Sequence, residues 1–198
     1  MPLCLHEESD LLRRQFNWPE RGKFPSWQRN FQITKCAVSS IPTDWTEHKI
    51  KSETMTDEVL FRKVFAIRGG DFKRAGEASV EVRNILKEVG FDPEVIRRVA
   101  IASYEAEMNV VMYGVRGKMD VKLKSDGIYL VVEDEGPGIP DVELAMQEGY
   151  STATEEMREM GFGAGMGLPN MKRNSDVFRI RSRMNKGTRV KMVIKKNG

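Results

Sequence analysis

The sequence contains few of the residues that mark secreted or membrane proteins. Its 198 residues include only two cysteines, Cys4 and Cys36, which excludes the disulfide framework of small secreted domains. No apolar run approaches the roughly 20 residues that span a bilayer. The N-terminus also lacks the basic and then apolar segments of a signal peptide. We therefore expect a cytoplasmic protein without a membrane partner.

Histidine and an excess of one charge are scarce as well. The two histidines, His6 and His48, and the two cysteines have no metal-ligand spacing, so no zinc site is expected. The 32 Lys and Arg nearly balance the 29 Asp and Glu, and the net charge is +3. Basic residues are spread along the chain, which gives little support for a nucleic-acid partner.

Composition divides the chain near residue 54. All three Trp, both Cys, both His and half of the Pro precede this point, whereas nearly all Gly and Met follow it. No helical or strand period persists in the first part. We expect residues 1–54 to be a disordered or non-native extension, and residues 55–198 to form the folded domain.

After residue 55, hydrophobic periodicity predicts a regular series of elements. The predicted strands are 59–67, 119–124, 128–134, 177–184 and 189–194, and the predicted helices are 71–88, 93–113, 141–147 and 168–174. Asp71 and Asp92 are the predicted N-caps of the first two helices. The segment 150–167 is polar and rich in glycine. Helices early and antiparallel strands late predict an α/β fold, a two-layer sandwich with helices on one face of a mixed, largely antiparallel sheet.

Two motifs place acidic and small residues at the ends of predicted elements. Glu105 and Asn109 are four residues apart on a helix and share a face, where they could activate a hydroxyl and hold Mg²⁺. Asp134 ends an apolar strand, and Gly136 and Gly138 follow it, so a flat heterocycle could approach the backbone and donate to the carboxylate. An amphipathic helix edge and an ordinary turn explain the two motifs equally simply.

The third motif is the glycine-rich stretch GFGAGMGLPN. Gly161, Gly163, Gly165 and Gly167 offer unobstructed backbone N–H groups immediately before a predicted helix at Leu168. Such groups attract phosphate. The stretch is neither the dinucleotide fingerprint nor the P-loop, because it lacks a preceding strand and a Gly-Lys-Ser/Thr sequence. A flexible loop is the alternative explanation.

The order of these motifs, followed by Gly187-Thr188, resembles the GHKL ATPase superfamily of DNA gyrase and the histidine kinases, with its Bergerat ATP-binding fold. The resemblance covers about residues 60–194. The stretches DEGPGIPDVELAMQEGYST and GAGMGLPNMKRNSDVFRI are most similar to the anti-sigma-factor serine/threonine kinases of bacteria, the branch that includes the stressosome switch kinase. No histidine follows His48, so a histidine kinase that phosphorylates itself is not expected.

The resemblance implies a protein serine/threonine kinase that uses ATP and Mg²⁺. By its positions, Glu105 would be the general base, Asn109 would ligate Mg²⁺, and Arg74 would help to neutralise the phosphates. Asp134 would accept from the adenine amine with the assistance of Thr188. Gly136 and Gly138 would pack beside the adenine. Gly163, Gly165 and Gly167 would line the phosphates.

The implied substrate is a STAS-type anti-anti-sigma protein, and the resemblance allows for a sigma factor as a second partner and for a homodimer. Two other functions stay open. One is an ATP-binding regulatory module without phosphotransfer, and the other is the catalytic fragment of a histidine kinase. The charged stretch 152–160 is either a solvated lid helix, which we favour, or an insert that contacts a partner.

Overall fold

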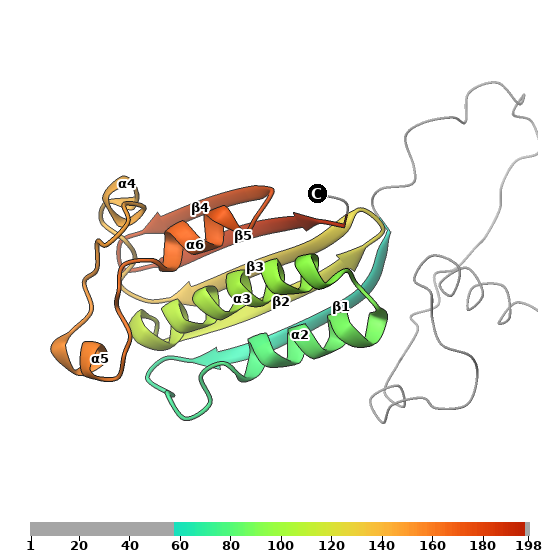
Figure 1. Ribbon diagram of the computed structural model, residues 1–198. Coiled ribbons are helices and arrows are strands. Elements are labelled where there is room, and N and C mark those ends of the chain that lie inside the picture. The colour runs from blue at the N-terminus through green and yellow to red at the C-terminus, as the bar shows by residue number, and fades with distance from the viewer. Residues whose placement is uncertain (1–57, 197–198) are drawn as a thin grey trace, which may run out of the picture. The chain divides into compact units, whose positions relative to one another are not determined.

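The described residues form a sheet of five strands, all paired antiparallel. The computed structural model describes residues 58–196. The strands are β1 (Val59–Arg68), β2 (Arg116–Lys124), β3 (Gly127–Glu135), β4 (Val177–Arg183) and β5 (Gly187–Lys195), and they lie side by side in the order β1-β2-β3-β5-β4 (Figure 1). The strands β1 and β4 are therefore the two edges of the sheet.

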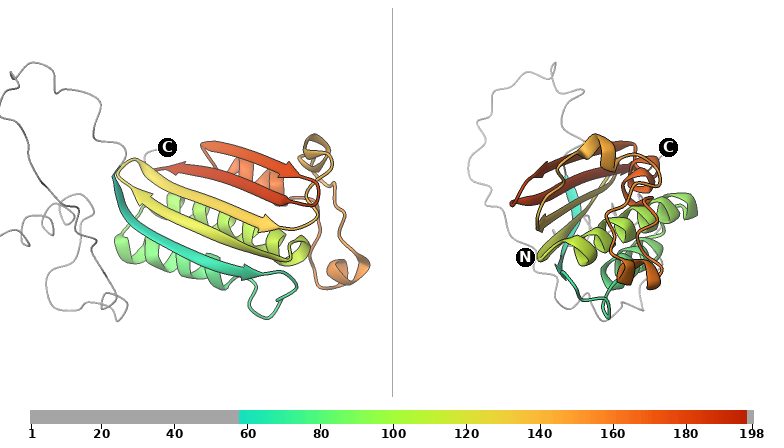
Figure 2. Two further views of the ribbon diagram at one scale, coloured as in Figure 1. Left: turned by 180° about the vertical axis from the view of Figure 1, so that it is seen from behind. Right: turned by 90° about the vertical axis from the view of Figure 1, so that its left-hand side faces the viewer.

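Helices cover one face of this sheet and leave the other uncovered by any described element. The long helices α2 (Glu77–Val89) and α3 (Pro93–Tyr113) run along the covered face, with α6 (Gly167–Arg173) beside α3. Seen from behind, the strands lie in front of the helices (Figure 2). The predicted two-layer α/β sandwich is confirmed, and its sheet is antiparallel throughout.

The core lies between the sheet and the helices. Alternate strand residues such as Met119, Leu130 and Met192 are fully buried, as are Val99 and Ala102 on the facing side of α3. The apolar residues that recur every second position in the strands thus pack against those that recur every three to four positions in the helix, and together they form one apolar layer. Two short helices, α4 (Val142–Ala145) and α5 (Glu155–Glu159), lie beyond the C-terminal end of α3 (Figure 1).

The start of α3 is as predicted, but the start of α2 is not. Asp92 accepts a hydrogen bond from the backbone N–H of Glu94 at 2.8 Å, and Pro93 occupies the first turn. Helix α2 begins at Glu77 and not near Asp71, because turns with positive φ at Gly70 (74°) and Gly76 (92°) occupy the intervening residues.

The glycine-rich segment after β3 contains a helix where the favoured interpretation placed a solvated lid helix. Residues 155–159 form α5, whose N-cap Thr154 accepts from the backbone N–H of Met157. The helix lies within the charged stretch 152–160 and is largely exposed. The predicted extension, residues 1–54, and its boundary with the domain lie outside the described residues.

Candidate functional site

A pocket of about 550 Å³ lies where α3, the end of β3 and the glycine-rich segment meet. Its volume is within the range of small-molecule sites. The segment between α4 and α6, which we call the lid (residues 149–166), borders it beyond the end of α3 (Figure 1). Most residues predicted from the three motifs line this pocket: Glu105, Asn109, Asp134, Gly138, Gly163, Gly165, Gly167 and Thr188.

One wall of the pocket is the face of α3 that carries Glu105 and Asn109. Both side chains are half-buried, one helical turn apart. The Nδ2 group of Asn170, on α6, donates to Oε1 of Glu105 at 2.7 Å. A Cβ atom added to Gly167 would lie 3.3 Å from Oδ1 of Asn109 and 3.6 Å from Oε2 of Glu105. Because this glycine has no side chain, the start of α6 approaches both oxygen-bearing groups closely.

The opposite wall is built around Asp134 at the end of β3. Burial raises the pKa of Asp134, and a hydrogen bond from the backbone of Thr188 partly offsets this effect. The start of β5 fits closely against this strand end, because any side chain at Gly187 would clash with the carbonyl of Asp134. Asp134 is thus a half-buried acceptor, held by the first residues of the neighbouring strand.

The turn after Asp134 is fixed by the β4–β5 hairpin. Gly138 has a φ of 77°, and a side chain there would clash with the carbonyl of Arg183. The backbone N–H of Ile139 donates to Oγ of Ser182 at 2.7 Å, and this hydroxyl lies 2.9 Å from Oγ1 of Thr188. Gly136 is not a lining residue; it lies behind Asp134, where an added Cβ would be 2.9 Å from Oδ1 of Asp134. The Asp-Glu-Gly-Pro-Gly motif is therefore a rigid turn.

The lid is folded back on itself by close backbone contacts. The N–H of Gly149 donates to the carbonyl of Gly165 at 3.0 Å. Gly163 and Gly165 have φ angles of 81° and 72°, and a Cβ at either would clash with the other side of the lid. The Phe162 ring stacks on Phe72 of the β1–α2 loop with a centroid distance of 6.0 Å. This stack ties the lid to a distant part of the chain.

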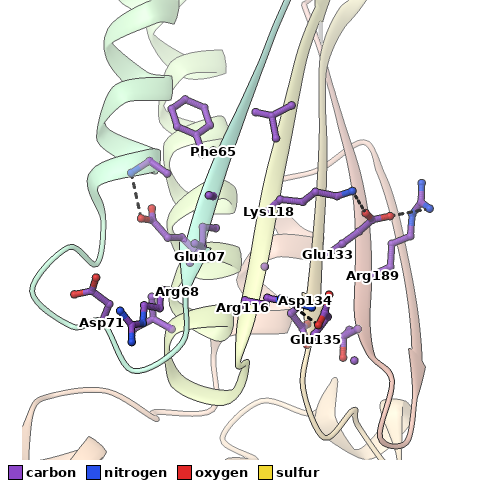
Figure 3. A pocket seen from close by; sticks show the side chains of 18 of the residues that line it. Phe65, Arg68, Asp71, Glu107, Arg116, Lys118, Glu133, Asp134, Glu135 and Arg189 are labelled. Carbon is purple, nitrogen blue, oxygen red and sulfur yellow. Dashed lines mark hydrogen bonds and ion pairs between the residues drawn. The ribbon is translucent and has the colours of Figure 1, made fainter.

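Arg74 is the one predicted catalytic residue that the structure does not bring to this pocket. Its Nε lies 2.9 Å from Oε2 of Glu77, and both side chains are exposed. It lines an open groove beside β1 together with Asp71 and Glu107 (Figure 3), and Asp134 and Thr188 line both this groove and the pocket. Arg74 does not line the pocket itself, so its role in phosphate binding stays a prediction.

Two site residues were missed at the sequence level. Asn170 was quoted only as part of the glycine-rich motif, yet its amide positions Glu105. Glu107 was not considered, although it is 3% exposed and accepts hydrogen bonds from the backbone N–H groups of Gly76, Ala78 and Ser79 at 2.8–3.1 Å. It caps α2 from the neighbouring helix. Glu107 lies two residues after Glu105, so it points to the opposite side of α3. This spacing could have indicated from the sequence that Glu107 faces the interior of the domain.

The donor set suits a magnesium ion shared with phosphates better than a protein-only metal centre. No group of three His, Cys, Asp or Glu side chains able to hold a metal occurs among residues 58–196. Mg²⁺ characteristically takes one or two protein oxygens and completes its shell with water and substrate phosphates. Oδ1 of Asn109, facing the pocket beside Gly167, is such an oxygen. None of the described helices is long and apolar enough to cross a bilayer.

Comparison with known proteins identifies relatives of this domain. Residues 71–194 match the family described as histidine kinase-like ATPase domain. The chain is 33% identical to the serine/threonine-protein kinase RsbT of Bacillus subtilis over 115 residues, which cover 56% of this chain and 80% of that protein. It is 30% identical to the anti-sigma F factor of Clostridium kluyveri over 120 residues, which cover 58% of this chain and 81% of that protein. For the anti-sigma F factor of a Thermoanaerobacter species the identity is 35% over 104 residues, with 50% and 69% covered.

Proposed function

Because the chain belongs to the family of histidine kinase-like ATPase domains, we propose that it is an ATP-dependent serine/threonine protein kinase of the anti-sigma regulatory type. The named kinase activity of one relative and the anti-sigma names of others support this assignment. The substrate we propose is a STAS-type anti-anti-sigma protein. A sigma factor as a second partner and a homodimer are further expectations of the same resemblance.

The observation that carries the proposal is the placement of Glu105. This carboxylate lines the pocket beside Asn109, and Oε1 accepts a hydrogen bond from Asn170 at 2.7 Å while Oε2 faces Gly167. A carboxylate with one oxygen held and the other directed at the pocket can accept a proton from a hydroxyl group. A module that only binds nucleotide has no need of such a base.

In this proposal Asp134 accepts from the adenine amine, and Thr188 assists from the start of β5. The Thr188 backbone bonds to Asp134, while its hydroxyl lies 2.9 Å from Ser182 Oγ. Gly138 lines the pocket and leaves the backbone there free of a side chain next to the ring, whereas Gly136 packs behind Asp134. The base would therefore be recognised by one carboxylate in a preformed slot.

Lid residues and α3 would hold the phosphates. The backbone N–H groups near Gly163, Gly165 and Gly167 are suited to bind phosphate oxygens, and Oδ1 of Asn109 would ligate Mg²⁺. When bound, the cation neutralises charge on the phosphate oxygens. Glu105 takes the proton of the substrate hydroxyl as that oxygen bonds to the γ-phosphorus and the bond to the ADP oxygen breaks.

The test is transfer of labelled γ-phosphate from Mg-ATP to protein by the full chain, in an extract of its source organism. Glu105→Gln is the critical variant. Glu94→Gln is the matched control, because Glu94 lies on the same helix but is exposed and pairs with Arg97. We expect acid-stable label on one small protein, lost with Glu105→Gln and retained with Glu94→Gln. Nucleotide binding should persist in both variants.

Two other outcomes would overturn the proposal in different ways. Tight nucleotide binding with no protein label would identify an ATP-binding regulatory module. Acid-labile label would identify a histidine as acceptor and would make the chain the catalytic part of a histidine kinase. A label that survives Glu105→Gln unchanged would remove this residue from the role of general base.

A further inference from the structure

The face of the sheet that no described helix covers is strongly basic. According to the strand register, twelve Lys and Arg side chains point to this face: two from β1, four from β2, three from β4 and three from β5. Three acidic residues accompany them: Asp120, Glu133 and Glu135. The other described residues carry twelve basic and eighteen acidic side chains. This face therefore carries a net positive charge, whereas the other described residues together carry a net negative charge.

This asymmetry could not be seen along the sequence. In a strand, alternate residues point to opposite faces, so basic residues that are spread evenly along β2, β4 and β5 gather on one side of the sheet. Figure 2 shows this side in its left view, and Figure 3 shows Arg116 and Lys118 on β2 and Arg189 on β5, with β3 between these two strands. The sequence-based conclusion that basic residues form no cluster is therefore wrong for the folded domain.

The β1–β2 half of this face is largely neutralised by ion pairs. Asp120 binds Arg62 through both oxygens, at 2.8 and 2.9 Å. Glu135 lies 2.7 Å from Arg116, and Glu133 lies 2.9 Å from Lys118. Carboxylate partners within the domain are thus already present for Arg62, Arg116, Lys118 and Lys122.

The other half contains a cluster of cations with almost no such partners. We call Arg179, Arg181, Arg183, Arg189 and Lys191, on β4 and β5, the basic cluster. Only Arg189 forms an ion pair with another described residue, and that residue is Glu133, at 2.8 Å. The strand register also places Arg181 directly opposite Arg189, and Arg179 directly opposite Lys191.

Two like-charge pairs side by side reduce the stability of a hairpin. Cross-strand like charges are unfavourable, whereas opposite charges at the same positions would be favourable. A ligand with several negative charges would remove this repulsion. Four of the five residues are arginine, whose planar guanidinium forms paired hydrogen bonds with carboxylates. We propose that the basic cluster is the docking surface for a partner protein with an acidic, carboxylate-rich face.

The surroundings of the cluster favour a protein over a nucleic acid. Proteins that bind single-stranded nucleic acids characteristically present aromatic rings on which the bases stack. The five described strands place one such ring on this face, Tyr129, and Lys124 lies over it at 4.8 Å from the centroid. Residues 1–57 carry equal numbers of acidic and basic side chains, so this segment has no excess of negative charge with which to neutralise the cluster.

The cluster also adjoins the candidate active site. The carbonyl of Arg183 packs against Gly138, in the turn that would hold the adenine, and the N–H of Asn185 donates to the carbonyl of Pro137 at 2.8 Å. A protein held by the basic cluster would lie next to the nucleotide pocket. Docking at this surface does not require that phosphate is transferred, so the two proposals can fail separately.

The test measures binding of a fluorescein-labelled oligoglutamate peptide to the full chain by anisotropy, at low and at raised salt. The critical variant is Arg181→Glu with Arg183→Glu. Its control is Arg83→Glu with Lys87→Glu, which makes the same charge change on exposed positions of α2. We expect the cluster variant to weaken binding at least about tenfold and the control by much less. If both variants lose peptide affinity equally, then the net charge of the protein explains the binding, and the proposal is overturned.

A second variant separates binding from folding. Arg181→Thr removes one like-charge pair, so the melting temperature should rise by about 1–3 °C while peptide binding weakens. A lower melting temperature would show a structural role and contradict the proposal. An oligonucleotide of equal charge and phosphatidylserine vesicles complete the series. Tighter binding of either than of the peptide, with the same dependence on Arg181, would assign the surface to a nucleic acid or a membrane instead.

Discussion

Two carboxylates on α3, two residues apart, perform different tasks because they face opposite sides of the helix. Glu105 faces the pocket and is held by Asn170, whereas Glu107 is buried and caps α2. The sequence predicted the first because its spacing to Asn109 forms a recognisable motif. It could not predict the second, because a cap donated from another helix depends on packing between distant segments.

Glu107 should be needed for stability. In Glu107→Gln, one oxygen becomes an amide donor that faces backbone N–H groups, so buried hydrogen bonds are lost. We expect the free energy of unfolding to fall by about 2–3 kcal/mol, measured by urea denaturation. Glu94→Gln, an exposed change on the same helix, should leave the free energy of unfolding nearly unchanged. A similar loss in both variants would contradict the assigned role of Glu107.

Asp134→Asn should stabilise the fold and abolish nucleotide binding. Burial raises the pKa of Asp134, so in the window between its ordinary and its raised pKa the folded state binds more protons than the unfolded state. Stability therefore falls as pH rises through that window. At neutral pH the variant should melt above the wild type, and the difference should vanish in acid. In the variant an NH₂ donor replaces one of the two carboxylate oxygens, and a donor cannot accept from the adenine amine.

Asp120→Asn provides a comparison of opposite sign. The hydrogen bonds from Arg62 lower the pKa of Asp120, so its ionised form contributes stability that is lost as pH falls through the lowered pKa. This variant should melt below the wild type at neutral pH. Melting curves of both variants from acid to neutral pH measure the sign of each variant's stability difference from the wild type. A parallel shift of both variants would contradict the assignment.

Gly167→Ala should separate nucleotide binding from folding. Gly167 is helical and has no positive φ, so alanine fits the backbone and helix propensity favours it. The added methyl would lie within 3.6 Å of both Asn109 and Glu105 and crowd the phosphate end of the pocket. We expect the Kd for Mg-ATP to rise about tenfold without loss of melting temperature, measured by calorimetry and thermal melting.

Gly161→Ala is the contrasting lid variant. A Cβ at Gly161 would meet nothing within 4 Å, but its φ of 85° strains any other residue. It should lower stability and leave ATP affinity nearly unchanged. If Gly161→Ala weakens ATP binding as much as Gly167→Ala does, then general disorder of the lid explains the effect, and crowding at Asn109 and Glu105 does not.

At the scale of elements, local signals were predictable and nonlocal ones were not. The start of α3 follows from Asp92 and Pro93, and both hairpins follow from short turns between apolar strands. The predicted start of α2 was wrong because the first backbone N–H groups of this helix are capped by Glu107 on α3, and not by a residue nearby in the sequence. The motif glycines were located correctly, but their contacts across the lid depend on segments that meet only in the fold.

The lid should depend on its stack with the β1–α2 loop. Phe162→Ala removes the contact with Phe72, which is worth about 0.5–1.5 kcal/mol beyond buried area. We expect faster hydrogen exchange in residues 149–166 and a Kd for ATP that rises several-fold, while the melting of the sheet is unchanged. Phe72→Ala should reproduce both effects. An effect of one variant without the other would show that the rings act separately.

At the scale of the molecule, the architecture could be predicted from the sequence, but the distribution of charge over its surface could not. The series of elements and the family resemblance predicted a sandwich with one open face. Which basic residues share that face depends on the order β1-β2-β3-β5-β4, in which β5 lies between β3 and β4. That order places Arg189 between Glu133 and Arg181, a relation with no local signature.

The position of β4 at the edge of the sheet has a consequence for solubility. An edge strand presents unpaired backbone groups to other molecules, and charged side chains on it oppose edge-to-edge aggregation. Arg179, Arg181 and Arg183 give β4 this protection. A partner that neutralises them removes the repulsion between the β4 edges of two copies. The same arginines thus keep the free protein dispersed and make its tendency to self-associate depend on what is bound.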